Sequence, residues 1–134
     1  MTPIFKKIAN HKDIQCEVIQ DLAMRAKSNI SQEYIVIIDE KEVGFLSFEH
    51  WSNKELGFIY EIFVSPSHRN NGIGKLILEF SKHLAEANNC NKIQLNVHPL
   101  DRTKDADYLL NWYKKHGYTS IGNNPLTLEK PLPQ

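Results

Sequence analysis

The clearest chemical signature in the sequence is the stretch RNNGIGK at residues 69–75, which combines two glycines with a basic residue at each end. A glycine in a helix costs about 1 kcal/mol relative to alanine, so Gly72 and Gly74 at the start of an apolar helical pattern point to another benefit. The first turn of a helix presents unpaired N–H groups and the positive end of the helix dipole, which together favour an anion. The two glycines let a phosphate approach that backbone, and Arg69 and Lys75 add positive charge.

Two well-known phosphate-binding patterns do not match this stretch. A dinucleotide fingerprint needs a third glycine where Ile77 stands, and a Walker loop needs four residues between its first glycine and the Gly-Lys pair. The pattern that does match is Arg/Gln-x-x-Gly-x-Gly/Ala, which residues 69–74 supply.

Hydrophobic spacing predicts the elements that must hold this loop in place. Apolar residues recur every three or four positions after Gly72, which predicts an amphipathic helix, and runs rich in β-branched and aromatic residues predict strands. In chain order we expect a strand at 4–9, a helix at 12–27 with Asn10 as its cap, a hairpin at 33–51 with its turn at 39–42, a strand at 56–64, a helix from 73 to about 88, a strand at 92–97, a short helix at 108–116, and one or two strands around an Asn-Asn-Pro turn at 123–125. This order predicts an α+β fold with a mostly antiparallel sheet.

Composition limits the classes of protein to consider. The 134 residues suit one domain, 1–134, and the equal numbers of basic and acidic residues, 16 each, argue against a general nucleic-acid binder. Cys16 and Cys90 have no metal-ligand spacing, so we expect free thiols and no metal. No segment is typical of a signal peptide or long enough to span a membrane. We therefore expect a cytoplasmic protein without membrane or nucleic-acid partners.

Together with its surroundings, the 69–74 pattern closely resembles the GNAT superfamily of acetyl-CoA-dependent acetyltransferases. The supporting features are the strand that ends before VSP, the amphipathic helix, the next strand, and the sequence NWYKKHGY at 111–118. The resemblance runs from Phe5 to Leu128 in element order and is densest from Tyr60 to Tyr118. It implies a mixed, mostly antiparallel sheet of six to seven strands, with helices on both faces and a splay between the fourth and fifth strands.

The resemblance also implies how acetyl-CoA binds. In the family, the pantetheine arm lies in the splay like an extra strand, and the glycine loop wraps the pyrophosphate. An unpaired strand edge needs partners for its backbone groups, which agrees with this arrangement. The residues implied for cofactor binding are Ile62, Phe63, Val64, Arg69, Asn70, Asn71, Gly72, Ile73, Gly74 and Lys75. The side chains of residues 62–64 can still be part of the core, because the cofactor would use their backbone.

Tyr113 matches the family tyrosine that lies near the cofactor sulfur. Its hydroxyl can protonate the leaving thiolate, whose conjugate thiol has a pKa of about 8.5. The alternative is that Tyr113 is only a packed aromatic residue on an amphipathic helix. Many family members carry an asparagine seven residues earlier, which contacts the pantetheine arm. This chain has Ala106 there, with Asp105 and Asp107 as possible substitutes.

Glu61 is the first candidate for the general base, because it lies on the strand that should flank the active site. The alternative for Glu61 is a solvent-facing strand residue, and Asn96 and His98 are weaker candidates for the base. A backbone N–H of the strand that ends at Val64 would hold the oxyanion of the tetrahedral intermediate.

The acceptor should lie between the first helix and the loops over the splay. One helix at 12–27, where many relatives have two, suggests an open acceptor site. The residues expected around it are Phe48, His50, Trp51, Tyr60, Glu61 and the loop 98–107. We expect direct attack by a primary amine, first a small amine and second a peptide N-terminus or lysine. Two alternatives belong to a different functional class: a non-catalytic acyl-CoA-binding module and another kind of nucleotide-binding protein. A homodimer stays open, because dimers are common in the family.

Overall fold

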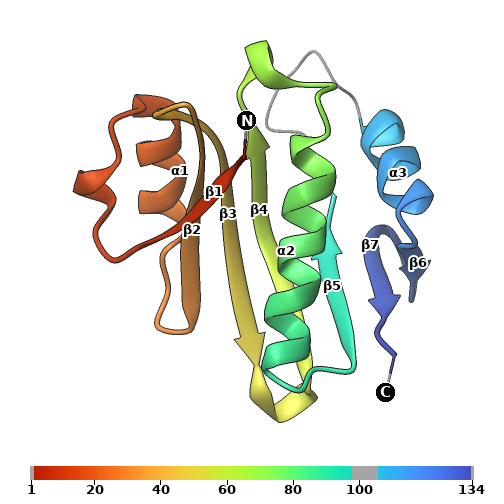
Figure 1. Cartoon of the computed structure of the whole chain (residues 1–134). Coiled ribbons are helices and arrows are strands. Elements are labelled where there is room, and N and C mark those ends of the chain that lie inside the picture. Colours follow the sequence, from red (N-terminus) through yellow and green to blue (C-terminus); the bar gives the residue numbers. More distant parts are fainter. Residues whose placement is uncertain (1, 98–105, 134) are drawn as a thin grey trace.

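The computed structural model describes residues 2–97 and 106–133, which form a seven-stranded sheet flanked by helices (Figure 1). The strand order is β1-β2-β3-β4-β5-β7-β6, and neighbouring strands are antiparallel except for the parallel pair β4–β5. The strands are β1 (Ile4–Ile8), β2 (Ser31–Ile38), β3 (Lys41–Trp51), β4 (Leu56–Val64), β5 (Lys92–Asn96), β6 (Thr119–Ile121) and β7 (Asn124–Pro131). The helices are α1 (Glu17–Ala26), α2 (Ile73–Ala87) and α3 (Ala106–Lys115). The predicted α+β class with a mixed, mostly antiparallel sheet is confirmed.

The helices cover opposite faces of the sheet. Side chains alternate between the two faces along a strand, so neighbouring residues of β2 pack in different cores. Ile35 belongs to the cluster that contains Ile19 of α1, whereas Val36 belongs to the cluster that contains Ile77 of α2. Residues of α3 pack against the same cluster as α2, and Figure 1 shows α2 lying across β4 and β5. The prediction of helices on both faces is therefore correct.

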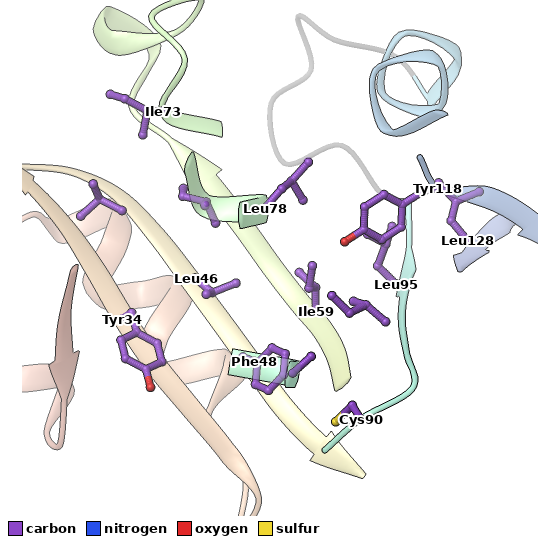
Figure 2. Close-up of a cluster of buried hydrophobic side chains, with 14 of the residues drawn as sticks. Tyr34, Leu46, Phe48, Ile59, Ile73, Leu78, Cys90, Leu95, Tyr118 and Leu128 are labelled. Carbon is purple, nitrogen blue, oxygen red and sulfur yellow. The ribbon is translucent and has the colours of Figure 1, made fainter. Parts of the chain in front are cut away.

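The larger core lies between the sheet and α2, and Figure 2 shows its side chains meeting from β3, β4, β5 and α2. Phe48 on β3 is fully buried there. A Cβ atom placed on Gly57 would lie 2.6 Å from Cζ of Phe48 and 3.2 Å from Cβ of Ala85. Gly57 is therefore the residue that lets the Phe48 ring lie over β4. Phe48 was expected beside the acceptor, and this expectation is wrong because its ring fills the core.

The predicted splay between β4 and β5 is present. Four residue pairs join the two strands, from Leu56 with Lys92 to Ile59 with Leu95. Among the described residues no pair joins β4 to β5 beyond this point, although β4 continues to Val64 and stays paired with β3. The second half of β4 therefore presents an edge to the opening.

The first helix begins later than predicted. Residues 11–13 form one 3-10 turn, for which Asn10 accepts a hydrogen bond from the Lys12 N–H at 2.9 Å, and α1 starts only at Glu17. The N–H groups of Gln15 and Cys16 donate instead to the carboxylate of Glu42 on β3, at 3.0 and 2.6 Å. This long-range partner holds the segment before α1 in a non-helical conformation, and local hydrophobic spacing cannot reveal it.

The turn between the last two strands also differs from the prediction. The chain turns at Gly122, whose φ of +64° is in the left-handed region, whereas Asn124 and Pro125 already belong to β7. The side chain of Asn124 accepts a hydrogen bond from the Leu126 N–H at 2.9 Å. Glycine adopts the left-handed conformation without a steric penalty, so the turn consists of Gly122 and Asn123 and not of the predicted residues 123–125.

Candidate active site in the splay

A cleft lies where β4 and β5 separate. Residues of three elements line it, namely Ile59, Tyr60, Glu61, Ile62, Leu95, Asn96 and Tyr113. Both residues predicted as catalytic, Glu61 on β4 and Tyr113 on α3, are therefore brought to one place. Asn96, the weaker candidate, is also there, and its side chain accepts a hydrogen bond from the Thr127 hydroxyl at 2.8 Å. Ile59 and Leu95 are lining residues that the sequence did not single out.

A β-bulge determines which way Glu61 faces. Ser47 of β3 lies opposite Glu61, but the next residue, Phe48, lies opposite Ile59, so Tyr60 is an extra residue in β4. Residues that lie opposite each other on paired strands share a face. Ile59 consequently faces the α2 core with Phe48, and Glu61 faces the α1 side with Ser47. Without the bulge Glu61 would share the face of Ile59, and bulges commonly re-aim a side chain in this way.

Glu61 ends a short row of buried polar residues that crosses the sheet. Glu33 of β2 lies opposite Ser47 of β3, which in turn lies opposite Glu61 of β4. All three are buried, and the Ser47 hydroxyl donates to Oε2 of Glu33 at 2.9 Å. Glu61 is 9 % exposed, so the alternative of a solvent-facing strand residue is wrong. Glu61 thus lies between the other members of this polar row and the cleft.

Tyr113 approaches the cleft from α3. Its ring packs against the larger core and makes edge-on contacts with the rings of Trp112 and Tyr118, at centroid distances of 5.0 and 5.9 Å. Burial raises the pKa of the Tyr113 hydroxyl well above its ordinary value of 10.0, and the negative charge of Glu61 raises it further. The hydroxyl therefore stays protonated at neutral pH and can donate a proton to a group in the cleft.

The loop after β4 is shaped by Arg69. Its Nε donates to the carbonyl oxygen of Val64, the last residue of β4, at 2.9 Å. Its guanidinium also lies over the Phe63 ring, 5.9 Å from the centroid. Asn70 follows with a left-handed φ of +66°, which turns the chain toward α2. Arg69 thus fixes the end of β4 next to the predicted anion-binding loop.

The two glycines of the loop are in different surroundings. Gly72 precedes α2 with φ at +81°, and a Cβ atom there would meet nothing within 4 Å. A Cβ atom on Gly74 would instead lie 2.9 Å from Cζ2 of Trp112. The open approach predicted for a phosphate is therefore present at Gly72, whereas Gly74 makes room for a side chain of α3.

The remaining predicted cofactor residues lie beside these glycines. Asn71 and Lys75 are exposed, and Ile73 is buried in the larger core, so that only its backbone can face the loop. His98 and Asp105 lie outside the described residues, and so do the other positions of the expected loop up to 105. Asp107 is exposed on the first turn of α3.

The residues expected around the acceptor are only partly brought together. Tyr60 is 41 % exposed and lines the cleft. Trp51 stacks on Phe58 at a centroid distance of 4.8 Å, and its indole N–H donates to Oε1 of Glu49 at 2.9 Å. His50 is half-buried at the end of β3, and the cleft lining does not include it.

Among residues 2–97 and 106–133, no group of three or more His, Cys, Asp or Glu side chains is placed to hold a metal ion. Over the same ranges no helix combines the length and apolar character needed to cross a bilayer.

A protein-family model matches the sequence of this chain. The family model for the acetyltransferase (GNAT) domain matches residues 30–120, which include β2 to α3 and the whole cleft. No curated protein matches the chain in sequence.

Solved structures show the same fold across almost the whole chain. PaiA N-acetyltransferase from Thermoplasma acidophilum, in complex with coenzyme A, has a TM-score of 0.71 and 14% identity, over 98% of this chain and 100% of that one. IAA acetyltransferase from Bacillus cereus has a TM-score of 0.74 and 14% identity, over 98% and 100%. A GNAT family acetyltransferase from Elizabethkingia anophelis with acetyl-CoA bound has a TM-score of 0.71 and 15% identity, over 97% and 98%. At these identities the likeness concerns the fold.

Proposed function

Because this chain belongs to the GNAT acetyltransferase family, we propose that it transfers the acetyl group of acetyl-CoA to a primary amine by direct attack. The observation that carries the proposal is the cleft in the splay, which Glu61 and Tyr113 line from different elements. One of these side chains can accept a proton and the other can donate one, which is the pair of functions that aminolysis of a thioester requires.

The co-substrate is held by the edge of β4 and by the loop after it. The backbone of Ile62, Phe63 and Val64 faces the opening beyond the last β4–β5 pair, where an extended amide-containing arm can pair with it. The pyrophosphate binds at the start of α2, where Gly72 leaves open space and Lys75 is exposed. The full set proposed for binding is Ile62, Phe63, Val64, Arg69, Asn70, Asn71, Gly72, Ile73, Gly74 and Lys75.

The reaction proceeds without a covalent enzyme intermediate. Glu61 takes a proton from the ammonium form of the acceptor, and the neutral nitrogen then attacks the thioester carbonyl carbon. A backbone N–H of β4 near Val64 stabilises the oxyanion. The C–S bond then breaks, the electron pair goes to sulfur, and Tyr113 gives its proton to the thiolate. The nitrogen, now bound to the acetyl carbon, loses its extra proton to water, and Tyr113 takes up a proton from water again. The products are the acetylated amine and coenzyme A.

The acceptor that we propose is a small primary amine. The segment between β1 and β2 holds a single α-helix of ten residues, α1, in accord with an open approach to the Glu61 side of the sheet. A peptide N-terminus or a lysine side chain is the second choice. Mass spectrometry of products from a panel of small amines, N-terminal peptides and lysine peptides distinguishes these acceptors.

The proposal is tested first by calorimetric titration with acetyl-CoA, with ATP as a comparison. The chain offers a matched pair, because Gly72 and Gly122 both have a left-handed φ and open space around a new Cβ atom. The Gly72→Asp variant places a carboxylate at the proposed pyrophosphate site, and Gly122→Asp puts the same strain and charge in the β6–β7 turn. We expect Gly72→Asp to weaken acetyl-CoA binding by at least about tenfold, or 1.4 kcal/mol, and Gly122→Asp to bind like the wild type.

Four results would count against the proposal. Absence of acetyl-CoA binding, or equal binding by the Gly72→Asp variant, would remove the loop as the pyrophosphate site. Competition by ATP at similar affinity would favour another kind of nucleotide-binding protein. Binding without release of free coenzyme A for any amine of the panel would favour a non-catalytic acyl-CoA-binding module.

A further inference from the structure

Trp112 is the side chain through which α3 meets the first turn of α2. A Cβ atom on Gly74 would lie 2.9 Å from Cζ2 and 3.2 Å from Cη2 of the indole, so the ring occupies the space of any side chain at position 74. The pattern Arg/Gln-x-x-Gly-x-Gly/Ala allows glycine or alanine at position 74. In this chain glycine alone leaves room for the indole, because a Cβ atom closer than 3.0 Å forces a shift.

The same indole contacts two rings of its own helix. Trp112 lies edge-on to Tyr113 at a centroid distance of 5.0 Å and edge-on to His116 at 4.9 Å. Trp112 is half-buried and packs against the larger core together with Tyr113. One rigid ring therefore joins the backbone of Gly74, in the proposed pyrophosphate loop, to the ring of the proposed acid.

We propose that Trp112 is a positioning residue that sets the place of the Tyr113 hydroxyl relative to the bound thioester. The inference rests on the proposed function, because the loop and Tyr113 are assigned there. The physical reason is that the sulfur is placed by the loop and by β4, while the hydroxyl is placed by α3. These two parts must keep one fixed separation, and a misplacement of about 1 Å can cost on the order of a hundredfold in rate.

A double-mutant cycle on Gly74 and Trp112 tests the contact. Gly74→Ala alone should push the indole away and lower kcat by about ten- to a hundredfold, while KM for acetyl-CoA changes less than about threefold. Trp112→Leu alone should lower kcat by a similar factor. In the double variant the alanine should cause no further loss, because the ring that it displaces is gone. If Gly74→Ala instead weakens acetyl-CoA binding by the same factor in both backgrounds, the co-substrate itself needs the space beside Cα of Gly74, beyond the backbone N–H that alanine keeps, and the proposal is overturned.

Two further variants separate positioning from a purely structural effect. Phe80 is a matched control, since it is another half-buried aromatic residue of the same core on α2 and stacks on Phe5 at 4.2 Å. Phe80→Leu should lower the unfolding temperature as Trp112→Leu does but keep the wild-type kcat and KM. Trp112→Phe, which keeps an aromatic ring, should restore most of the kcat. Wild-type kcat in Trp112→Leu would overturn the proposal.

A readout that does not depend on turnover comes from fluorescence. The chain has two tryptophans, so Trp51→Phe leaves Trp112 as the single indole emitter. Titration of this variant with coenzyme A should change its emission with the affinity measured by calorimetry, because the ligand fills the loop against which the indole packs. Calorimetric binding with unchanged emission would contradict the inference. Failure of the proposed function is a different result, since wild-type protein would then bind no acetyl-CoA, and both proposals would fall.

Discussion

Glu61 and Tyr113 face the same cleft from β4 and α3, and the charge of Glu61 adds to burial in raising the pKa of the Tyr113 hydroxyl. A phenol is protonated at neutral pH even at its ordinary pKa of 10.0, and the nearby carboxylate makes loss of that proton still less favourable. Such a pair has the division of roles that an acyl transfer to an amine needs, with a base on one side of the reacting carbonyl and an acid on the other.

Tyr113→Phe removes the acid and keeps the ring. We expect kcat to fall by about 10²- to 10⁴-fold, the usual contribution of a positioned acid, with little change in the dissociation constant of acetyl-CoA. Steady-state release of coenzyme A and calorimetry provide the two numbers. Tyr108→Phe, on an exposed position of the same helix, is the control. Unchanged kcat in Tyr113→Phe would restrict Tyr113 to a packing role.

Glu61→Gln removes the proposed base while keeping the shape of the side chain. We expect kcat/KM for the amine to fall most at neutral pH, because an alkyl amine with a pKa of about 10.4 is then almost fully protonated. The loss should shrink as pH rises toward that value, where the acceptor loses its proton without help. A pH–rate profile of wild type and variant checks this, with the exposed Glu79→Gln as the charge control. A loss that is constant across pH would show that Glu61 does not act as the base.

Ser47→Ala tests the polar row beside the site. Ser47 is fully buried and donates to Glu33, which is also buried, so the variant leaves a buried carboxylate with one donor fewer. We expect the free energy of unfolding to fall by about 1–3 kcal/mol. Ser81→Ala is the matched control, because Ser81 is equally buried but donates within α2 to the Ile77 carbonyl. Urea unfolding of both variants gives the comparison, and equal losses would mean that the Glu33 contact adds nothing.

His116 should make the free energy of unfolding depend on pH. Its pKa is lowered from the ordinary 6.5, first by burial and then by nearby lysines. The charged groups involved are Lys115, Lys75 and Lys130, with Glu79 acting in the opposite direction. Because the unfolded chain binds the proton more readily, stability should fall as pH drops below about 6.5.

The His116→Gln variant should consequently lose less stability than the wild type between pH 7.5 and 5.5. Urea unfolding at both pH values measures the difference. His83→Gln serves as the control, since His83 is 77% exposed on α2. If His116→Gln loses as much stability between the two pH values as the wild type does, other groups cause the pH dependence.

Much of the fold could be predicted because hydrophobic spacing is a local property. The positions of β4, α2, β5 and α3 followed from periodicity, and the glycines marked the start of α2. The loop and the splay came from the family resemblance of residues 69–74 and 111–118. The predicted ends of elements were wrong where a residue distant in the sequence determines them. Glu42 of β3 delays the start of α1, and no pattern near Gln15 records that contact.

The site was predictable in its residue identities but not in its geometry. Simple alternation puts Ile59 and Glu61 on one face, and the bulge at Tyr60 separates them. The pattern also suggested one purpose for both glycines, whereas Gly74 accommodates Trp112. Bulges and close ring contacts depend on the pairing of distant segments, so a single sequence does not specify them.

The short pairing of β4 with β5 has a consequence for the life of the protein in a cell. Among the described residues, four pairs join these two parts of the sheet, and under the proposed function an acyl-CoA fills the rest of the seam. A ligand that binds the folded chain alone stabilises it by about 2.7 kcal/mol at a hundredfold excess over its dissociation constant. Degradation of such a chain proceeds through its transiently opened form. Under the proposed function, bound acetyl-CoA should therefore slow proteolysis of this chain.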